Sequence, residues 1–284
     1  MEKVALLFSG GQDSVLALTA LRKDRSREIV ALVATFTDTD DRLTMHRVRR
    51  ALIEAQATSL KCRMEAVHVP VGASNASYEQ AMARTLMRLR DEGVRTIATG
   101  DLHLAEIRAY REAWLGTLGL RPLFPIWGHA PERVAREFVD AGYRAAVVCI
   151  DRDRMPVESV GKTFDHPWLD ALPAGVDPCG EGGEFHTFVH DGPGFAFPIP
   201  IAKQTVYSDQ RFAFAELELG PHSTCTVCRT PFACGAELQT EHCWCMAEPK
   251  ITPDLSAAQC MCPRCLADTI IRRSAPDPLF QRDS

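Results

Sequence analysis

The sequence predicts an α/β protein: a parallel sheet, then a smaller α+β unit and a short cysteine-rich module. Short apolar runs alternate with amphipathic segments through the first half of the chain, which is the rhythm of βαβ units. After about residue 151 glycine and proline become frequent, and eight cysteines then lie between Cys225 and Cys265. These observations divide the chain into residues 1–125, 126–220 and 221–268, with a flexible tail over 269–284.

The composition is that of a globular protein with an ample core. The chain has 284 residues, of which 46% are hydrophobic and 24% charged. No run reaches the length of a membrane span and no signal-peptide pattern is visible, so we expect a cytoplasmic protein without a membrane partner. The net charge of −5 argues against a nonspecific nucleic-acid binder, although it is compatible with a local basic patch. The sequence does not predict an oligomeric state.

The periodicity of apolar residues predicts the individual elements. Apolar runs predict strands over residues 4–8, 29–36, 66–71, 96–100 and 145–150. Amphipathic spacing predicts helices over residues 14–22, 44–57, 77–92, 105–118 and 131–141. The third helix is well delimited, since Ser77 and Gln80 have capping-box spacing and Gly93 suits the position after its end. Helices between strands imply a parallel, doubly wound sheet, and alternation over residues 211–219 predicts a half-buried strand in the smaller unit.

A glycine-rich turn joins the first predicted strand to the first predicted helix, with the sequence Ser9-Gly10-Gly11-Gln12-Asp13-Ser14. Glycines let the backbone approach an anion, and the N–H groups and dipole of a helix start favour phosphate. Ser14 can cap the helix or donate its hydroxyl to a phosphate, and Asp13 can hold Mg²⁺. The alternative is an ordinary turn of small residues between a strand and a helix.

Polar residues also follow the strand predicted over residues 96–100. Asp101 comes directly after it, at the sheet edge where ligands bind in open α/β sheets. Arg108 and Glu112 are four residues apart on the next helix, which is equally typical of a surface ion pair. Arg111 can neutralise phosphate charge.

Residues 177–187, DPCGEGGEFHT, combine carboxylates, an imidazole and a glycine pair. Glu181, Glu184 and His186 can bind an ammonium-like nucleophile or transfer protons. The alternative is a solvated glycine-rich hairpin, and Cys179 is more typical of a small buried residue than of a nucleophile. A further histidine, His46, lies at the predicted start of the second helix, where a lone histidine is usually structural, so we assign it no catalytic role.

These segments together resemble the diphthine–ammonia ligase family of PP-loop ATPases. The glycine-rich turn is similar to the PP-loop, SGGxDS, of ATP pyrophosphatases, which split ATP between its α and β phosphates. The Met-His pair near residue 46, Gly100-Asp101 with its arginines, and residues 177–187 follow in the family's order. The resemblance covers roughly residues 1–219.

The resemblance implies a HUP-type, Rossmann-like sheet domain that carries the PP-loop, and a smaller domain that completes the active site. It implies an enzyme that amidates the diphthine carboxylate on elongation factor 2, consuming ATP and ammonia and releasing AMP and pyrophosphate. The expected nucleotide-binding residues are Ser9, Gly10, Gly11, Gln12, Asp13, Ser14, Gly100, Asp101, Arg108 and Arg111. The expected catalytic residues are Asp13, Glu181, Glu184 and His186, and Gly183 is expected to line the acceptor site beside them.

Gln12 departs from the family pattern, in which the loop has lysine at this position. A lysine would add positive charge beside the phosphates, whereas glutamine offers neutral hydrogen bonds. The PP-loop relative 7-cyano-7-deazaguanine synthase also carries glutamine here, so the residue is compatible with activity.

The C-terminal cysteines have the spacing of a metal-binding module. They are Cys225, Cys228, Cys234, Cys243, Cys245, Cys260, Cys262 and Cys265. Two C-x2-C pairs far apart are typical of structural Zn²⁺, and Cys225, Cys228, Cys262 and Cys265 form the natural first set. The segment resembles the cysteine-rich CWC domain. Eight thiolates are enough for one or two ions. The alternatives are an iron–sulfur site, disulfides or reactive thiols, and His222 or His242 can replace a cysteine ligand.

The sequence therefore predicts an ATP-dependent, adenylate-forming amide ligase whose partners are ATP, Mg²⁺, ammonia or an amine, and a carboxylate. The carboxylate can be protein-borne or a small molecule. Alternatives are an enzyme like 7-cyano-7-deazaguanine synthase, a tRNA-modifying PP-loop enzyme, or a nucleotide-binding regulatory protein that grips a partner with its zinc module.

Overall fold

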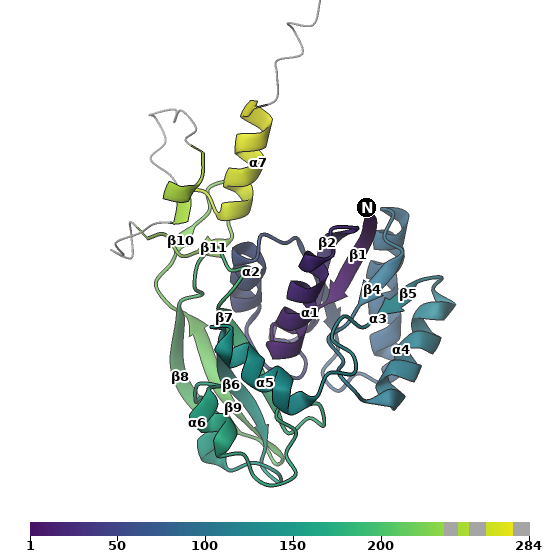
Figure 1. Ribbon diagram of the computed structural model, residues 1–284, viewed down its shortest axis with the longest axis vertical. Helices are drawn as coiled ribbons and strands as arrows, with labels where there is room; N and C mark the ends of the chain where they lie inside the picture. Colours follow the sequence, from purple (N-terminus) through teal and green to yellow (C-terminus); the bar gives the residue numbers. More distant parts are fainter. Residues whose placement is uncertain (236–243, 250–259, 275–284) are drawn as a thin grey trace, which may run out of the picture.

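A computed structural model describes residues 1–235, 244–249 and 260–274, and it begins with a five-stranded parallel sheet (Figure 1). The strand order is β3-β2-β1-β4-β5, with every neighbouring pair parallel. The strands are β1 (Glu2–Leu7), β2 (Arg27–Thr37), β3 (Met64–Val69), β4 (Thr96–Ala98) and β5 (Arg121–Leu123). The helices between them are α1 (Gln12–Lys23), α2 (Arg50–Ser59), α3 (Asn75–Asp91) and α4 (Ala105–Thr117). The predicted α/β class and Rossmann-like parallel sheet are confirmed.

Helices cover both faces of this sheet, which is why its strands β1 and β2 contain buried apolar runs. In β1, Val4 and Leu6 belong to a core cluster shared with α1 and α2, whereas Ala5 belongs to a second cluster with α3 and α4. Successive side chains of a strand point to opposite faces, so this alternation assigns one helix pair to each face.

A second, antiparallel sheet follows, in the order β7-β6-β9-β8. Its strands are β6 (Arg144–Asp151), β7 (Phe185–Asp191), β8 (Ile201–Ser208) and β9 (Phe212–Leu219), and α5 (Pro131–Asp140), η1 (Val157–Ser159) and α6 (His166–Asp170) accompany them. Val147 and Phe188 of this sheet lie in the same core cluster as α1 and α2. Figure 1 accordingly shows α1 and α2 between the two sheets. The strand predicted over residues 211–219 is confirmed as β9.

Three local predictions need correction. The strand predicted over 145–150 is β6, which pairs antiparallel with β7 and β9, and β5 is the fifth parallel strand instead. The helix predicted over 44–57 begins only at Arg50, because residues 44–46 form a turn. Helix α3 begins earlier than predicted and is capped by Ser74, whose hydroxyl accepts from Ser77 N. Gly93, with φ of +100°, ends α3 as predicted.

The cysteine-rich segment forms a small module against α2. It contains β10 (Ser223–Thr224), β11 (Pro231–Phe232), η2 (Trp244–Ala247) and α7 (Pro263–Ser274), and both β11 and α7 contact α2. Because α7 continues to residue 274, the first residues of the predicted tail are helical, and residues 275–284 lie outside the described part. No helix within the described residues is long and apolar enough to cross a membrane.

Candidate functional site

The glycine-rich loop lies between β1 and α1 and is held from behind by α2 and β7. Gly10 has φ of +72°, a conformation that glycine adopts without strain. A side chain at Gly10 would meet Gln56 Oε1 at 2.6 Å. The fully buried Gln56 amide donates to Gly10 O (3.0 Å) and to Val189 O (2.6 Å), and Val189 N donates to Gly10 O (2.9 Å). The loop backbone is therefore fixed by residues from helix α2 and from strand β7 of the second sheet.

The start of α1 is fixed by the segment that contains the two glutamates. Gln12 N donates to Thr187 Oγ1 (3.0 Å), and its Nε2 donates to Cys179 Sγ (3.3 Å). Gly11, not Ser14, is the N-cap of α1, while the Ser14 hydroxyl lies in the first turn and donates to Gly11 O (2.9 Å). The prediction that Ser14 is the N-cap is thus wrong. Its alternative role, donating its hydroxyl to a phosphate, stays a prediction.

A cavity of about 260 Å³ opens at the carboxyl ends of β1, β2 and β4. This is the point where the strand order reverses and where doubly wound sheets bind ligands. Of the predicted site residues, the cavity is lined by Ser9, Asp13, Ser14, Gly100, Asp101, Arg111, Glu181 and His186. The structure thus brings together residues that are up to 177 positions apart in the chain.

The pKa of Asp13 is strongly perturbed in this cavity. Burial raises the pKa of Asp13 well above its ordinary value, and the nearby carboxylates of Glu181, Asp177 and Asp101 raise it further. Its Oδ1 is buried and has no hydrogen-bond partner among the described residues. A buried, unpartnered carboxylate oxygen beside other carboxylates is suited to a cation, and oxygen donors are those that Mg²⁺ prefers.

The end of β4 packs directly on the loop. A side chain at Gly100 would lie 2.8 Å from the Asp13 carbonyl carbon, so only glycine fits. The next residue, Asp101, accepts from Arg111 Nε (2.6 Å) and Nη2 (3.2 Å) and from the Thr99 hydroxyl (2.6 Å). Although burial lowers it, the pKa of Arg111 is raised overall by the Asp101 carboxylate. Arg111 is therefore the cation of the cavity wall and also holds Asp101 in place.

The two predicted glutamates face different surroundings. Glu181 lines the cavity, and its Oε2 accepts from Leu102 N (3.1 Å). Burial raises the pKa of Glu181 more than this hydrogen bond lowers it. Glu184 lies outside the cavity with a side chain only 3% exposed, and its Oε1 pairs with Arg154 at 2.7 Å. The geometry therefore favours Glu181 over Glu184 for contact with a ligand.

Two predicted nucleotide-binding side chains also lie outside the cavity wall. Arg108 pairs with Glu112 (2.7 Å) and lies over the rings of Phe124 and Trp127, at 5.0 and 4.8 Å. The Gln12 side chain is buried toward Cys179 instead of the cavity. Cys179 is a buried core residue as predicted, and burial raises the pKa of its thiol.

His46 is the residue that the sequence reasoning missed. It lines the cavity, stacks on His186 with ring centroids 4.5 Å apart, and places Nδ1 3.0 Å from Thr187 O. Burial lowers the pKa of His46 to about 4 and that of His186 well below its ordinary value. The sequence signal was present, since His46 follows the second strand, but a helix was expected there and obscured it.

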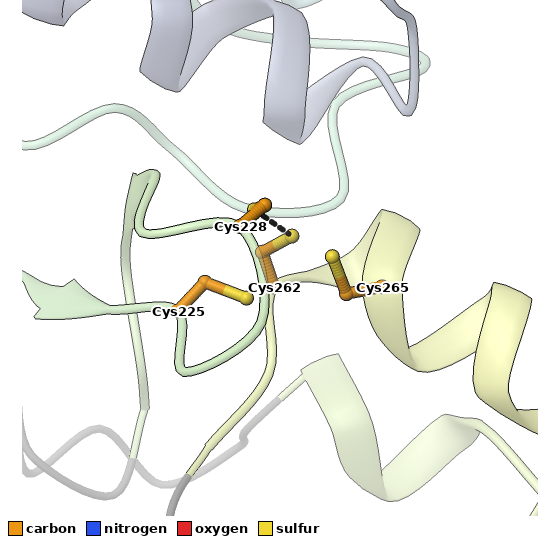
Figure 2. Close-up of side chains that lie close together, drawn as sticks. All are labelled: Cys225, Cys228, Cys262 and Cys265. Carbon is orange, nitrogen blue, oxygen red and sulfur yellow. Dashed lines mark hydrogen bonds between the residues drawn. The ribbon is translucent and has the colours of Figure 1, made fainter.

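Four cysteines gather in the C-terminal module (Figure 2). The sulfur atoms of Cys225, Cys228, Cys262 and Cys265 all lie within 4.8 Å of one another, and those of Cys228 and Cys262 are 3.6 Å apart. Four thiolates on a tetrahedral ion at about 2.3 Å would be spaced by about 3.8 Å, so the set fits one metal ion. This is the set that the C-x2-C spacing singled out.

The other predicted ligands are only partly placed. The sulfur atoms of Cys234 and Cys260 lie 3.7 Å apart, and Cys245 lies in η2. Cys243 and His242 are outside the described residues. His222 is described, and its Nδ1 lies 2.8 Å from Gly220 O.

Comparison with protein families assigns the two sheets and the cavity to a known family. Residues 2–122 match the family described as diphthamide synthase N-terminal domain, and residues 130–220 match diphthamide synthase C-terminal domain. The chain belongs to the diphthamide synthase family. The two matched ranges contain every residue that lines the cavity and both sheets except Leu123 at the end of β5, and they end at residue 220, before the cysteine module.

Proteins similar to this chain include the diphthine–ammonia ligases of three mammals. The human and bovine proteins are 34% and 32% identical over 103 residues, which is 34% of this chain and 39% of each relative. In these alignments the chain therefore spans well under half of the relatives' length. The mouse protein is 25% identical over 241 residues, an alignment that covers 75% of this chain and 88% of the mouse protein.

One solved structure is also similar, a predicted subunit of tRNA methyltransferase from Methanocaldococcus jannaschii. The superposition covers 51% of this chain and 80% of the chain of that structure, with 16% identity and a TM-score of 0.36. Likeness at this level carries no argument about this member of the diphthamide synthase family.

Proposed function

We propose that the protein is an ATP-dependent amide ligase similar to diphthine–ammonia ligase. The observation that carries the proposal is the convergence of the Ser9–Ser14 loop, Asp101 and Glu181 on one cavity at the switch point of the parallel sheet. The loop offers N–H groups of a helix start to phosphate, and the family names an amide-forming reaction.

We expect the base of the nucleotide to contact the apolar residues of the cavity wall and its phosphates to lie at the loop. These apolar residues include Val33, Met82 and Tyr78, and the loop contributes Asp13 to the wall. The charged groups of the wall are three carboxylates and the Arg111 guanidinium, so a polyphosphate needs additional cations to bind there. Asp13 Oδ1, with Asp101 and Glu181 nearby, would hold Mg²⁺, which when bound would neutralise phosphate charge.

The chemistry proposed has two halves. The substrate carboxylate attacks the α-phosphorus of ATP, and pyrophosphate leaves, stabilised by the N–H groups of the loop. Activation is needed because a carboxylate is a poor electrophile at neutral pH. Ammonia then attacks the acyl-adenylate, and AMP leaves as the amide forms. Glu181 and His186 line the cavity in which the second half takes place.

The cysteine cluster has a separate, structural role in this proposal. Four thiolates closed around one ion leave no open coordination position, which is typical of structural Zn²⁺. A reducing compartment keeps these thiols available for metal, so we place the protein in the cytoplasm.

The test is the identity of the nucleotide product. The protein is incubated with ATP, Mg²⁺, ¹⁵N-ammonium and elongation factor 2 that bears diphthine, alongside a panel of small carboxylates. We expect AMP and pyrophosphate only with an acceptor, and ¹⁵N in the acceptor amide. ADP as the main product, or AMP formed equally without any carboxylate, would contradict the proposal.

A further inference from the structure

His46 lies in a hydrogen-bonded turn beside the glycine-rich loop. Leu43 and Val48 close the turn, since Leu43 N donates to Val48 O (2.9 Å), and Thr44 N donates to Thr35 O of β2 (3.2 Å). A side chain at Gly11 would lie 2.9 Å from His46 Cε1, so the edge of the imidazole touches the loop backbone. The ring is therefore positioned at the wall where bound phosphates would lie.

One hydrogen bond fixes which nitrogen of His46 carries the proton. The carbonyl oxygen of Thr187 can only accept, so Nδ1 at 3.0 Å must be the donor. In a neutral imidazole the other nitrogen, Nε2, then has a free lone pair. Burial holds the pKa of His46 at about 4, which keeps the ring neutral at physiological pH.

A neutral acceptor at this position excludes several ligands. Phosphate oxygens and carboxylate oxygens are themselves acceptors and gain nothing from the Nε2 lone pair. The matching ligand is an N–H or O–H donor, and ammonia, the nucleophile of the proposed reaction, is one such donor. His186 stacks on His46 at 4.5 Å, both rings line the cavity, and the buried Nε2 of His186 has no partner among the described residues.

We propose that His46 is the catalytic residue that removes the proton from ammonia as it attacks the acyl-adenylate. This role rests on the proposed function. The nitrogen forms a bond to the acyl carbon, and one N–H proton passes to His46 Nε2. The bond from the acyl carbon to the AMP oxygen then breaks, and its electron pair leaves with AMP. The imidazolium returns its proton to water, while Thr187 holds the ring throughout.

The test separates the two halves of the reaction in His46→Asn. Asparagine can still donate to Thr187 O but has no group in the place of Nε2 that takes a proton. With diphthine-bearing elongation factor 2 and no ammonia, we expect ATP–pyrophosphate exchange within about threefold of wild type. With ¹⁵N-ammonium we expect amide formation to fall by about 10²-fold or more, the usual contribution of a general base.

A second nucleophile and a second variant keep the result specific. Hydroxylamine is less basic than ammonia, and its adduct loses a proton readily to water, so hydroxamate formation should be affected at least about tenfold less. His46→Gln places an acceptor near Nε2 that cannot hold a proton, and it should lose amide formation as His46→Asn does. The exposed His68, paired with Asp41 outside the cavity, gives the matched control His68→Asn, expected to be unchanged.

Each outcome decides a different question. Unchanged amide formation in both His46 variants would overturn the proposed role. Equal loss of exchange and amide formation, or equal loss with ammonia and hydroxylamine, in a variant that melts like wild type would show that His46 only supports the loop. Absence of exchange and of AMP in the wild-type protein would instead overturn the proposed ligase function on which this role rests.

Discussion

At the residue scale, Asp13 is placed where binding and stability have opposite requirements. The folded protein raises the pKa of Asp13, so it holds this proton more tightly than the unfolded chain does. The contribution of Asp13 to the free energy of unfolding therefore falls as pH rises from its ordinary pKa through the raised one. In the proposed function, a bound cation would offset the charge of this carboxylate.

Replacing this carboxylate should separate the two requirements. We expect Asp13→Asn to lose AMP formation by at least about 10²-fold, because the contact to cation and phosphate is gone. Without ligand, the same variant should have a higher free energy of unfolding than wild type above pH 4, and a flatter dependence on pH. Nucleotide chromatography and urea titrations at several pH values measure the two effects.

The control is Asp91→Asn, on an exposed side chain at the end of α3, which should change neither quantity. Full turnover in Asp13→Asn would remove the PP-loop assignment. An unchanged pH dependence of unfolding would show that the cluster of carboxylates does not strain the unliganded fold.

Position 12 shows what a residue type alone cannot reveal. Its main-chain N–H binds Thr187, and its side chain is turned to Cys179, away from the cavity. A neutral amide suits a position that is 1% exposed and donates to a thiol. The sequence identified the departure from the family's lysine but gave no direction for the side chain, since Cys179 is 167 residues away.

At the element scale, β4 and the loop approach each other through Gly100. The added methyl of Gly100→Ala would lie 2.8–3.0 Å from main-chain atoms of Asp13 and Ser14, and backbone cannot yield as a side-chain tip can. We expect a loss of about 1–3 kcal/mol in the free energy of unfolding and at least tenfold weaker ATP binding. Denaturant titration and calorimetry measure these changes.

A second glycine offers the matched control. Gly116 lies within α4, where an added methyl would meet no atom within 4 Å. Gly116→Ala should stabilise the protein by about 0.5–1 kcal/mol and leave ATP binding unchanged. If Gly100→Ala behaves like Gly116→Ala, the loop is not packed on β4 as described.

Helix α2 is the element that ties the loop to the second sheet. The Gln56 amide serves Gly10 O and Val189 O at once, so Gln56→Leu leaves these buried groups with fewer donors. We expect a loss of about 1–3 kcal/mol in the free energy of unfolding and an increase in the KM for ATP. Gln80→Leu, on the exposed face of α3, is the control, and equal effects of the two changes would contradict the bridging role.

The elements that the sequence predicted correctly are those with local signals. The strand, glycine turn and helix at residues 4–22 each carry their own pattern, and Gly93 ends α3 where a positive φ is needed. Strand β5 has three residues, including Pro122, and such a run has too little periodicity to be seen. The sheet to which β6 belongs depends on pairing with β7 and β9, which follow it at a distance.

The site was predictable only in part, for the same reason. Both of its main segments, residues 9–14 and 177–187, were identified from their composition and family resemblance. Which side chains face the cavity depends on tertiary partners, such as Arg154 for Glu184. His46 was assigned no catalytic role because a lone histidine near a helix start is usually structural, and no local pattern indicates its contact with Thr187 O, 141 residues away.

At the scale of the whole molecule, the cysteine module is joined to the main core. Cys225, Cys262 and Cys265 belong to the same buried cluster as α2, and Phe197 contacts both Phe232 and Trp244. Metal that orders this module should thus stabilise the whole protein without taking part in the chemistry.

Removing one thiolate tests this division. Cys228→Ser should abolish binding of about one Zn²⁺ per chain and lower the melting temperature by about 5 °C or more. The Kd for ATP should stay within about threefold of wild type, because the cysteines lie outside the cavity. Elemental analysis, thermal melts and nucleotide titration give the three values.

Cys62→Ser is the control, since Cys62 lies outside the four-cysteine cluster and should leave the metal content unchanged. Iron in the purified protein would overturn the zinc assignment. Loss of ATP binding in folded Cys228→Ser would overturn the separation of structural metal from chemistry.

The hydrogen bonds between β7 and the loop can form only late in the synthesis of the protein, after β7 has been translated. Gln12 N and Gly10 O, near the start of the chain, find their partners at Thr187 and Val189. Because a ribosome delivers the N-terminal part first, the parallel sheet emerges while those partners are still untranslated. A chain that ends before β7 therefore contains the entire loop sequence but lacks Thr187 and Val189, the partners that fix the loop backbone.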